Sequence, residues 1–507
     1  MNSVPPLRLT NGQPAERAAL PIVPFRKFRE QVLYSLQQDA RLAAFYAVPR
    51  QGTTFQLVAV MAHGGSGDFS LISTDIEDHY QALTPGCVQA HWFEREIAEQ
   101  WAITPEGHPW LKPLRFHRSY RKDNDAWNRD PATEILPGVT TYFRVEGEEV
   151  HEVAVGPVHA GVIEPGHFRF QCYGERVLHL EISLGYQHRG IERALLGGPT
   201  LKTISHMETL AGDTTIGHAT AYCQAVEALA GCVVPERAEA IRGIALELER
   251  LANHVGDLGA LAGDVGYLPT SSYCGRLRGE LLNLTALLCG NRFGRNLLRP
   301  GGSAFDLEEP RAAELLNRLD RTMRDITGAV TLLWNVPSVL ARFEDTGMIS
   351  RQTALDLGLV GPSVRACGVD RDARRDFPSG IFKRAPVKVA VGKSGDVFAR
   401  AWVRWLELEH SMEFLRAQLP DLPRGALRAD CGPLASESLV VSMVEGWRGE
   451  ICHVAMTDQA GRIAHYKIVD PSFHNWMGLS MALRNQEISD FPLCNKSFNL
   501  SYCGHDL

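Results

Sequence analysis

The sequence lacks three features that would place it in a functional class at once: cysteines at metal-binding spacing, a long hydrophobic run and an excess of positive charge. Its 11 cysteines are an odd number, and no two of them form a C-x-x-C motif. Neither a disulfide framework nor a standard zinc or iron–sulfur motif is therefore present. The longest apolar stretches, such as residues 55–62, are far shorter than the about 20 residues that a membrane-spanning helix needs. We expect no direct transmembrane segment.

The net charge is −7, from 52 Lys and Arg against 59 Asp and Glu. This balance leaves no basic field to hold a polyanion, so we expect no nucleic-acid partner. The first residues are interrupted by prolines and charges and contain no apolar segment of the kind that a secretory signal requires. These features favour a cytoplasmic protein whose membrane association comes through partners.

The hydrophobic pattern predicts an α+β fold. A helix is expected at residues 24–36, strands at 43–50, 54–62 and 68–74, and a second helix at 91–101. A polar, proline-punctuated stretch follows, and then alternating segments from residue 140 onwards. Long helices are expected at 219–230, 237–261, 277–287, 311–333 and 397–415, before strands at 438–446, 451–458 and 463–470. We predict a small N-terminal α/β domain (1–118), a linker (119–139) and a mainly helical domain (140–507). This last domain has small antiparallel sheets where the chain enters it and at its C-terminus.

Four residues of the helix predicted around 237–263 recur at steps of three, four and three positions, which places them on one helical face: Glu247, Arg250, His254 and Asp257. One interpretation is a solvated stripe with ordinary ion pairs. The other is an internal charged lane, in which His254 titrates near neutrality and relays protons. The spacing does not choose between them.

Three further clusters combine residue types that carry chemistry. The turn at 185–192 contains His188, Arg189 and Glu192, which also suits a helix start with a satisfied histidine. The segment 445–453 contains Glu445, Arg448, Glu450 and His453, and an arginine between carboxylates is more often a structural ion pair than a catalytic device. The C-terminus contains Cys503, His505 and Asp506, but a metal there would need a further ligand from elsewhere.

Several motifs, in this order, carry a family resemblance: GPVHAGVIEPGHFRF (156–170), YQHRGIE (186–192), LELERLANHVGDLGALAGDVGY (246–267), FGRNLLRPGG (293–302), GPSVRACGVDRDAR (361–374), GDVFARAWVRWLELEHS (395–411) and VEGWRGEICH (444–453). The chain from 140 to 507 resembles the large subunit of energy-converting, formate hydrogenlyase-type nickel–iron hydrogenases and the related quinone-site subunit of respiratory complex I. Through WFEREIAEQWAITPEGHP (92–109), the first domain resembles the small peripheral subunit of complex I. The resemblance implies the hydrogenase-large-subunit fold for the second domain.

The sequence departs from the hydrogenase pattern at the metal ligands. The resemblance implies four thiolates, from an R-x-C-G-x-C and a D-P-C-x-x-C motif. Ala211 and Thr214 stand at the first pair of positions, and Ser501 and Gly504 at the second. Alanine and glycine offer no donor atom, and soft thiolates are what hold such a centre. We therefore expect no metal and no cofactor in this chain, and no hydrogen turnover.

The complex I resemblance implies a quinone site instead, formed by a histidine in the first strand–turn loop and a tyrosine before the next helix. His159 matches the histidine, whereas Gly212 stands at the tyrosine position. The polar residues predicted to remain at the site are His159, Glu192, Asp213 and His218. His159 and His218 are candidate proton donors, with Asp213 orienting one of them. Alternatively, these groups only fill space left by a lost cofactor.

The implied function is that of an oxidoreductase subunit in a membrane-bound, complex I-like assembly, peripheral on the cytoplasmic side of the inner membrane. Implied partners are an iron–sulfur small subunit that holds the cluster, a ferredoxin-like subunit and complex I-like membrane subunits. A quinone or another small acceptor would take the electrons. Predicted proton-relay residues are Glu247, Arg250, His254, Asp257, His188 and Arg189. A non-catalytic scaffold subunit is the alternative, and a hydrogenase with atypical ligands is the third possibility.

Overall fold

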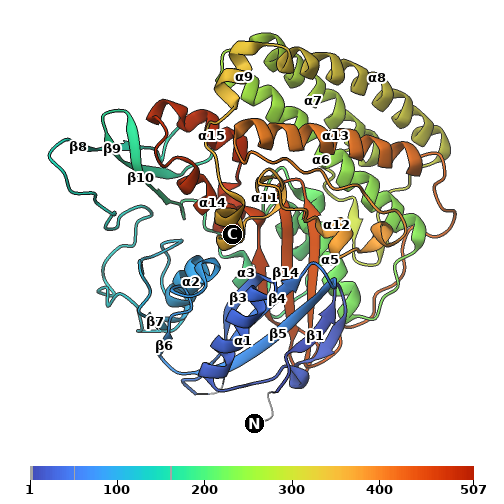
Figure 1. Cartoon of the computed structure of the whole chain (residues 1–507). Coiled ribbons are helices and arrows are strands. Elements are labelled where there is room, and N and C mark those ends of the chain that lie inside the picture. Colours follow the sequence, from blue (N-terminus) through green and yellow to red (C-terminus); the bar gives the residue numbers. More distant parts are fainter. Residues whose placement is uncertain (1–3, 51, 160–162) are drawn as a thin grey trace.

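The computed structural model describes residues 4–50, 52–159 and 163–507, and it confirms the α+β class (Figure 1). The N-terminal unit is an antiparallel sheet of four strands in the order β1-β5-β4-β3, formed by β1 (Leu7–Thr10), β5 (Asp68–Ile76), β4 (Phe55–His63) and β3 (Arg41–Pro49). Helix α1 (Phe25–Gln37) packs on this sheet, and α2 (His91–Trp101) contacts β3. β3 and β4 are buried almost throughout, because both of their faces are covered.

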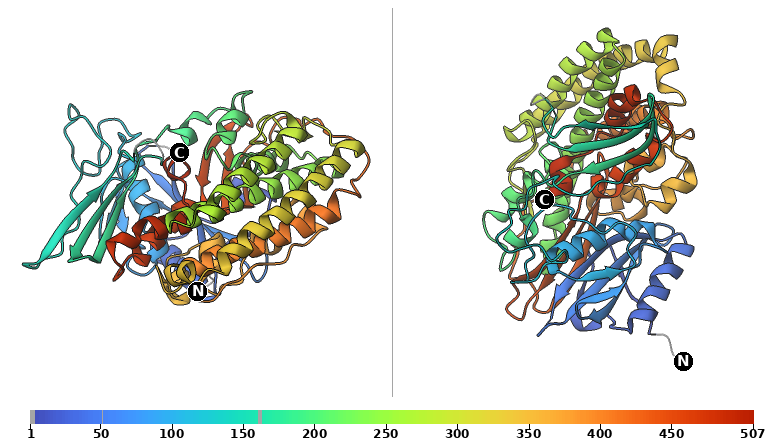
Figure 2. Two further views of the ribbon diagram at one scale, coloured as in Figure 1. Left: turned by 90° about the horizontal axis from the view of Figure 1, so that it is seen from above. Right: turned by 90° about the vertical axis from the view of Figure 1, so that its left-hand side faces the viewer.

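A three-stranded antiparallel sheet projects from the body, in the order β10-β9-β8 (Figure 2). It consists of β8 (Val150–Val155), β9 (His167–Tyr173) and β10 (Arg176–Ser183). Residues 140–149, whose alternation also predicted a strand, have no strand structure. The backbone N–H of Phe143 donates to the Glu181 carboxylate at 2.8 Å, and that of Val145 to the side chain of Gln171. These two N–H groups therefore bind side-chain oxygens in place of the carbonyl groups of a neighbouring strand. The predicted linker, 119–139, contains no helix or strand.

The helical layer is built around α6 (Glu236–Asp264), which packs against α7 (Leu268–Cys289) and α13 (Val397–Gln418) (Figure 1). α8 (Glu309–Trp334) covers α7, and α5 (Thr215–Leu229) lies on the C-terminal sheet. Among the described residues, no single helix is both long and apolar enough to cross a bilayer. Only α8 and α9 (Pro337–Phe343) taken together, with a bend of 80° between them, meet those criteria.

The C-terminal sheet has the order β15-β14-β13-β2, and its last member comes from the N-terminal unit. β13 (Ser438–Gly446), β14 (Gly449–Thr457) and β15 (Ile463–Val469) form a meander, and β2 (Pro14–Glu16) pairs with the start of β13. Beyond β2, the Asn11 side-chain amide donates to the Met443 carbonyl at 2.8 Å and accepts from its N–H at 2.8 Å. The two predicted domains thus share a sheet.

Helices α14 (Pro471–Ala482), α15 (Phe491–Phe498) and α16 (Tyr502–Asp506) complete the chain. The remaining short strands and helices are β6 (His79–Gln81), β7 (Thr104–Glu106), α3 (Ile191–Ala194), α4 (Thr203–Glu208), β11 (Leu298–Arg299), β12 (Gly302–Ser303), α10 (Arg351–Asp356), α11 (Gly361–Arg365) and α12 (Ala373–Asp376).

Candidate functional site

The two loops that resemble metal-ligand motifs lie side by side. Ala211 and Thr214 lie between α4 and α5, and Ser501 and Gly504 lie at the start of α16. Arg189 joins the loops, because its guanidinium donates to the carbonyls of Thr209 (2.8 Å) and Leu210 (2.9 Å) on one side and to that of Cys503 (3.1 Å) on the other. Arg189, a predicted relay residue, therefore holds the backbone of both loops.

The donor set at these four positions does not fit a thiolate-bound metal centre. Ala211 is buried and has no donor, and the Thr214 hydroxyl accepts from Trp447 Nε1 (3.1 Å) and Arg448 Nη1 (3.2 Å). The Ser501 hydroxyl caps α16 by accepting from the Gly504 N–H at 2.9 Å. Among the described residues, no group of three or more His, Cys, Asp or Glu side chains is arranged to hold a metal ion.

Gly504 faces a carboxylate at very short range. A Cβ atom on Gly504 would lie 2.7 Å from both Cγ and Oδ2 of Asp470 and 2.9 Å from Ser501 Oγ. A cysteine at this position would therefore collide with Asp470. The space beside Gly504 holds a carboxylate, and no room is left there for a side chain.

An ion pair lies on the other side of the site, at the loop between α4 and α5. Arg448 forms a bidentate pair with Asp213, at 2.6 Å (Nη1–Oδ1) and 2.8 Å (Nη2–Oδ2), and its guanidinium lies 3.9 Å from the Trp447 ring centroid. Burial acts to raise the pKa of Asp213, but the Arg448 charge outweighs it and lowers that pKa. The Asp213 side chain is 31% exposed, so the pair reaches the surface of the chain.

The sequence suggested carboxylate partners for Arg448 on its own hairpin. The structure gives those carboxylates other partners: Glu445 pairs with Arg365 at 2.8 Å, and Glu450 pairs with Arg41. Arg448 instead reaches across to the α4–α5 loop.

A chain of four buried side chains starts at Asp470: Asp470, His218, His453 and Tyr466. His218 Nε2 lies 2.9 Å from Asp470 Oδ2, and His218 Nδ1 lies 3.2 Å from His453 Nε2. His453 Nδ1 lies 2.9 Å from the Tyr466 hydroxyl. α5 supplies His218, β14 and β15 supply His453 and Tyr466, and Asp470 caps α14 by accepting from the Ser472 N–H. We call these four residues the histidine relay.

The hydrogen bonds of the histidine relay fix its tautomers. If both histidines are neutral and Asp470 is ionised, only one arrangement satisfies all three bonds. Tyr466 O–H then donates to His453, His453 Nε2–H to His218, and His218 Nε2–H to Asp470. A proton added to His218 reverses the first two bonds, and Asp470 remains as its counterion. Burial, and then the neighbouring His218, hold the pKa of His453 well below its usual range, which disfavours a charged His453 ring.

The other predicted site residues lie apart from the histidine relay. His159 lies in the β8–β9 loop, with its Nε2 3.0 Å from the Gly166 carbonyl oxygen. Within the described ranges no contact joins it to His218 or Asp213, and residues 160–162 of the same motif lie outside those ranges. Glu192 binds Lys467 Nζ (2.9 Å) and accepts from the Ile468 N–H (2.8 Å).

Lys467 alternates with Tyr466 along β15, so Glu192 lies on the opposite face of the sheet from the histidine relay. Glu192 therefore belongs to the contact with the N-terminal unit, where Lys467 also binds Glu96 at 2.7 Å.

His188 is half-buried in the turn between β10 and α3. Its ring stacks on that of His117, with centroids 4.6 Å apart, and its Nδ1 donates to the Asp506 carbonyl at 2.7 Å. Burial, followed by the charges of Arg115 and His117, lowers the pKa of His188 to about 4. At neutral pH the ring is therefore uncharged.

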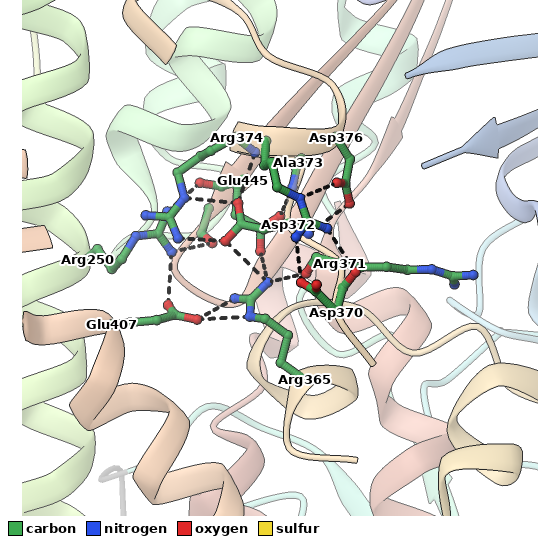
Figure 3. A network of polar contacts seen from close by, with 12 residues as sticks. Arg250, Arg365, Asp370, Arg371, Asp372, Ala373, Arg374, Asp376, Glu407 and Glu445 are labelled. Atoms are coloured by element: carbon green, nitrogen blue, oxygen red, sulfur yellow. Dashed lines mark hydrogen bonds and ion pairs between the residues drawn. The ribbon is translucent and has the colours of Figure 1, made fainter. Parts of the chain in front are cut away.

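The four residues of the predicted lane on α6 are all buried, which excludes the solvated stripe: Glu247, Arg250 and His254 are 0% exposed and Asp257 is 2% exposed. Their partners come from distant segments (Figure 3). Glu407 of α13 accepts from His254 Nε2 (2.8 Å) and Arg365 Nη2 (2.5 Å), with Arg250 at 3.4 Å. The arrangement is an internal charged lane, and its role in proton transfer stays a prediction.

The ends of the lane reach other parts of the molecule. Arg374 binds both oxygens of Glu247 at 3.0 Å. At the other end, Asp257 binds Arg404 at 2.6 Å and accepts from the side chain of Asn499. Since the Asn499 carbonyl accepts from Arg448 Nε at 2.5 Å, the lane connects to the Asp213–Arg448 pair.

The charges around Glu407 do not balance if every group is ionised. Four carboxylates (Glu247, Asp372, Glu407, Glu445) face three guanidinium groups (Arg250, Arg365, Arg374). Burial lowers the pKa of His254, so it adds no positive charge. Burial and the neighbouring Asp372 raise the pKa of Glu445, which makes Glu445 the group best suited to hold a proton.

Sequence reasoning missed Asp470, Tyr466 and Glu407. Glu407 had a signal: it is a carboxylate on the apolar face of the helix predicted at 397–415. Asp470 precedes a proline at a helix start, which indicates a cap and gives no sign of a histidine partner.

Comparisons with known proteins show which family the chain belongs to. The family described as the 49 Kd subunit of respiratory-chain NADH dehydrogenase matches residues 264–438. The carbon monoxide-induced hydrogenase of Rhodospirillum rubrum is 31% identical over 352 residues, which cover 69% of this chain and 97% of that protein. NADH-quinone oxidoreductase subunit 4 of Thermus thermophilus is 31% identical over 369 residues (68% of this chain, 90% of that protein). Formate hydrogenlyase subunit 5 of Escherichia coli is 28% identical over 434 residues (83% and 76%).

The relatives include both oxidoreductase subunits and hydrogenase components, as the sequence motifs had indicated. The chain belongs to the family that contains both the 49-kDa-type subunit of NADH-quinone oxidoreductase and the large subunits of the related hydrogenases.

Proposed function

We propose that this chain is the hydrogenase-like large subunit of a membrane-bound, complex I-related redox complex that works without a nickel–iron centre. Electrons from the cluster of an iron–sulfur small subunit reduce a quinone, or another small acceptor, bound where the two subunits meet. The observation that carries this proposal is the histidine relay, which begins at Asp470 directly beside Gly504. Relatives named as subunits of NADH-quinone oxidoreductase support the choice of acceptor.

The relay suits an acceptor that takes protons together with electrons. Two electrons and two protons convert a quinone to a quinol. His218, when protonated and paired with Asp470, supplies one proton, and His453 and Tyr466 rearrange their hydrogen bonds as it leaves. His159 is the candidate for the second proton, and the lane from Glu247 to Asp257 is the candidate path for protonation changes toward the membrane subunits. The site lies on the cytoplasmic side of the membrane in this proposal, and a ferredoxin-like subunit completes the electron path.

A scaffold function is the second candidate, and one observation favours it. Asp213, Thr214 and Arg448 satisfy one another, so these side chains need no ligand to complete their hydrogen bonds. The third possibility, a hydrogenase with atypical ligands, conflicts with the donor set described above.

The first test is elemental analysis of the complex purified with its native partners from solubilised membranes. We expect iron, from the partner's cluster, and no nickel per copy of this chain. Stoichiometric nickel would contradict the proposal.

The second test is Asp470→Asn, measured as quinone reduction by the intact complex. Asp470 accepts from the His218 and Ser472 N–H groups with different oxygens, and asparagine keeps only one acceptor oxygen. The counterion for protonated His218 is also lost, so the rate should fall about 100-fold or more with assembly unchanged. Asp320→Asn, in an exposed pair with Arg416, is the matched control and should leave the rate unchanged.

A double variant, His159→Ala with His218→Ala, should abolish electron transfer while the complex still assembles. Wild-type rates in both Asp470→Asn and this double variant would favour the scaffold function.

A further inference from the structure

Two partly exposed cysteines from distant segments meet at the end of α5. Cys232 lies in the turn between α5 and α6, and Cys431 lies in the segment that leads into β13. Cys232 Sγ lies 3.8 Å from the carbonyl oxygen of Asp430, which is 198 positions further along the chain. The thiols of Cys232 and Cys431 form a hydrogen bond with each other. The fold therefore brings together two thiols that the sequence keeps far apart.

Main-chain hydrogen bonds hold both segments in place. The Cys232 N–H donates to the Glu227 carbonyl at 2.8 Å. On the side of Cys431, the Ala435 N–H donates to the Leu229 carbonyl, also at 2.8 Å. Both segments are thus bound to the last turns of the same helix, and the contact between the thiols has a rigid base.

The pair also differs from most other cysteines of the chain in its exposure. Cys232, Cys431 and Cys503 are partly exposed, and the others are buried. Buried structural thiols are inert, whereas partly exposed thiols can react with molecules from the solvent. The Cys503 thiol contacts Ser501 and Glu164. Cys232 and Cys431 are therefore the pair suited to react with each other.

We propose that Cys232 and Cys431 form a reversible disulfide bond by exchange with a low-molecular-weight disulfide such as oxidised glutathione. In reducing compartments, protein disulfides of this kind are transient and respond to the redox state of the surroundings. The bond joins the end of α5 to the segment before β13. The pair is separate from the histidine relay, and the proposal does not depend on the proposed function.

The exchange proceeds in two steps. The Cys232 thiolate first attacks one sulfur of the small disulfide, whose S–S bond breaks, and the first small thiol leaves with the bonding electrons and takes up a proton. Cys431 then loses its proton, attacks the Cys232 sulfur and displaces the second small thiol, which takes up that proton. Two protein thiols are thus oxidised, and the small disulfide is reduced to two thiols.

The order of the two steps follows from the surroundings of Cys431. Burial, and then the hydrogen bond with Cys232, raise the pKa of Cys431 to about 12. The thiolate is the nucleophilic form, so Cys431 is a poor first nucleophile. We therefore assign the first attack to Cys232 and the second, which occurs within one molecule, to Cys431.

The test is equilibration of the full chain in mixtures of reduced and oxidised glutathione, followed by alkylation of the remaining thiols and peptide mapping by mass spectrometry. We expect a peptide pair linked through Cys232 and Cys431 to appear as the share of oxidised glutathione rises. The link should disappear when excess dithiothreitol is added. A cross-link restrains the unfolded chain, so the urea midpoint of the oxidised chain should also rise.

Two variants separate this reaction from ordinary thiol modification. Cys431→Ser should stop the exchange after its first step and leave Cys232 joined to one glutathione. Cys503→Ser removes the other partly exposed thiol and is the matched control, so it should form the link to the same extent as the wild type.

No linked peptide in the wild type at any glutathione ratio would overturn the proposal, and that outcome does not require any variant to fold. Equal glutathione adducts on Cys232 and Cys503, without a link, would overturn it as well, because Cys232 would then be an independent surface thiol.

Discussion

Glu407→Gln is expected to lower the free energy of unfolding by about 3–5 kcal/mol, the usual cost of removing one partner from a buried ionic network. Glu407 is 1% exposed, and its two oxygens serve Arg365, His254 and Arg250. Glutamine preserves the shape of the side chain but not its charge. Arg365 and Arg250 then lose the charged carboxylate that they share.

The matched control is Glu413→Gln on the same helix. Glu413 is exposed and pairs with Lys388 at 2.9 Å, so its loss should cost no more than about 1 kcal/mol. Urea unfolding followed by circular dichroism measures both variants. Equal shifts of the two unfolding midpoints would show that the lane contributes nothing beyond ordinary surface pairing.

The same substitution has an expected pH dependence. Burial acts to raise the pKa of Glu407, but the charge of Arg365 and the hydrogen bond from His254 hold that pKa well below its ordinary value of 4.5. A carboxyl group whose pKa is lowered on folding stabilises the folded state above its unfolded pKa and loses that contribution as the pH falls through the folded pKa. The stability difference between wild type and Glu407→Gln should therefore be complete at pH 6–7, values above the ordinary pKa of 4.5, and should narrow as the pH falls below that value.

Gly504→Ala is expected to destabilise the chain by about 1–3 kcal/mol, the usual cost of overpacking, and to disconnect the histidine relay. The added Cβ would lie 2.7 Å from the Asp470 carboxylate, closer than real Cβ contacts permit. Asp470 must therefore move, and its 2.9 Å contact with His218 lengthens. The ring resonances of His218 in a histidine-labelled sample report this change directly.

Gly212→Ala is the control for this variant. Gly212 belongs to the neighbouring ligand-like loop, and a Cβ there would meet nothing within 4 Å. We expect unchanged stability and unchanged His218 resonances. If Gly504→Ala behaved in the same way as Gly212→Ala, the close approach of Asp470 to Gly504 would affect neither the stability nor the histidine relay.

Elements with strong local periodicity were predicted closely. Helix α2 begins at His91 and ends at Trp101, and β13 covers 438–446, the same bounds that the hydrophobic pattern indicates. Strand β2 was missed, because three residues that include a proline carry no pattern of their own. It exists only because β13, more than 400 residues later, supplies the hydrogen-bonding partner.

In the candidate site, too, local features were predicted from the sequence and contacts between distant segments were not. Helical spacing places Glu247 and His254 on one face of α6, but spacing holds no information on whether that face meets solvent. The answer depends on Glu407, which lies more than 150 residues further along the chain. His218 was identified from the sequence, whereas its partner Asp470 was not, since 252 residues separate the two.

The pairing of β2 and Asn11 with β13 has a consequence for any attempt to divide the chain. These two elements cover the outer edge of the C-terminal sheet, including both main-chain groups of Met443. A fragment that starts after residue 20 would leave that edge uncovered. Bare, apolar sheet edges recruit strands from other molecules, so such a fragment should aggregate on expression. The N-terminal segment thus protects the edge of the C-terminal sheet, and we expect a soluble product only from a chain that contains both.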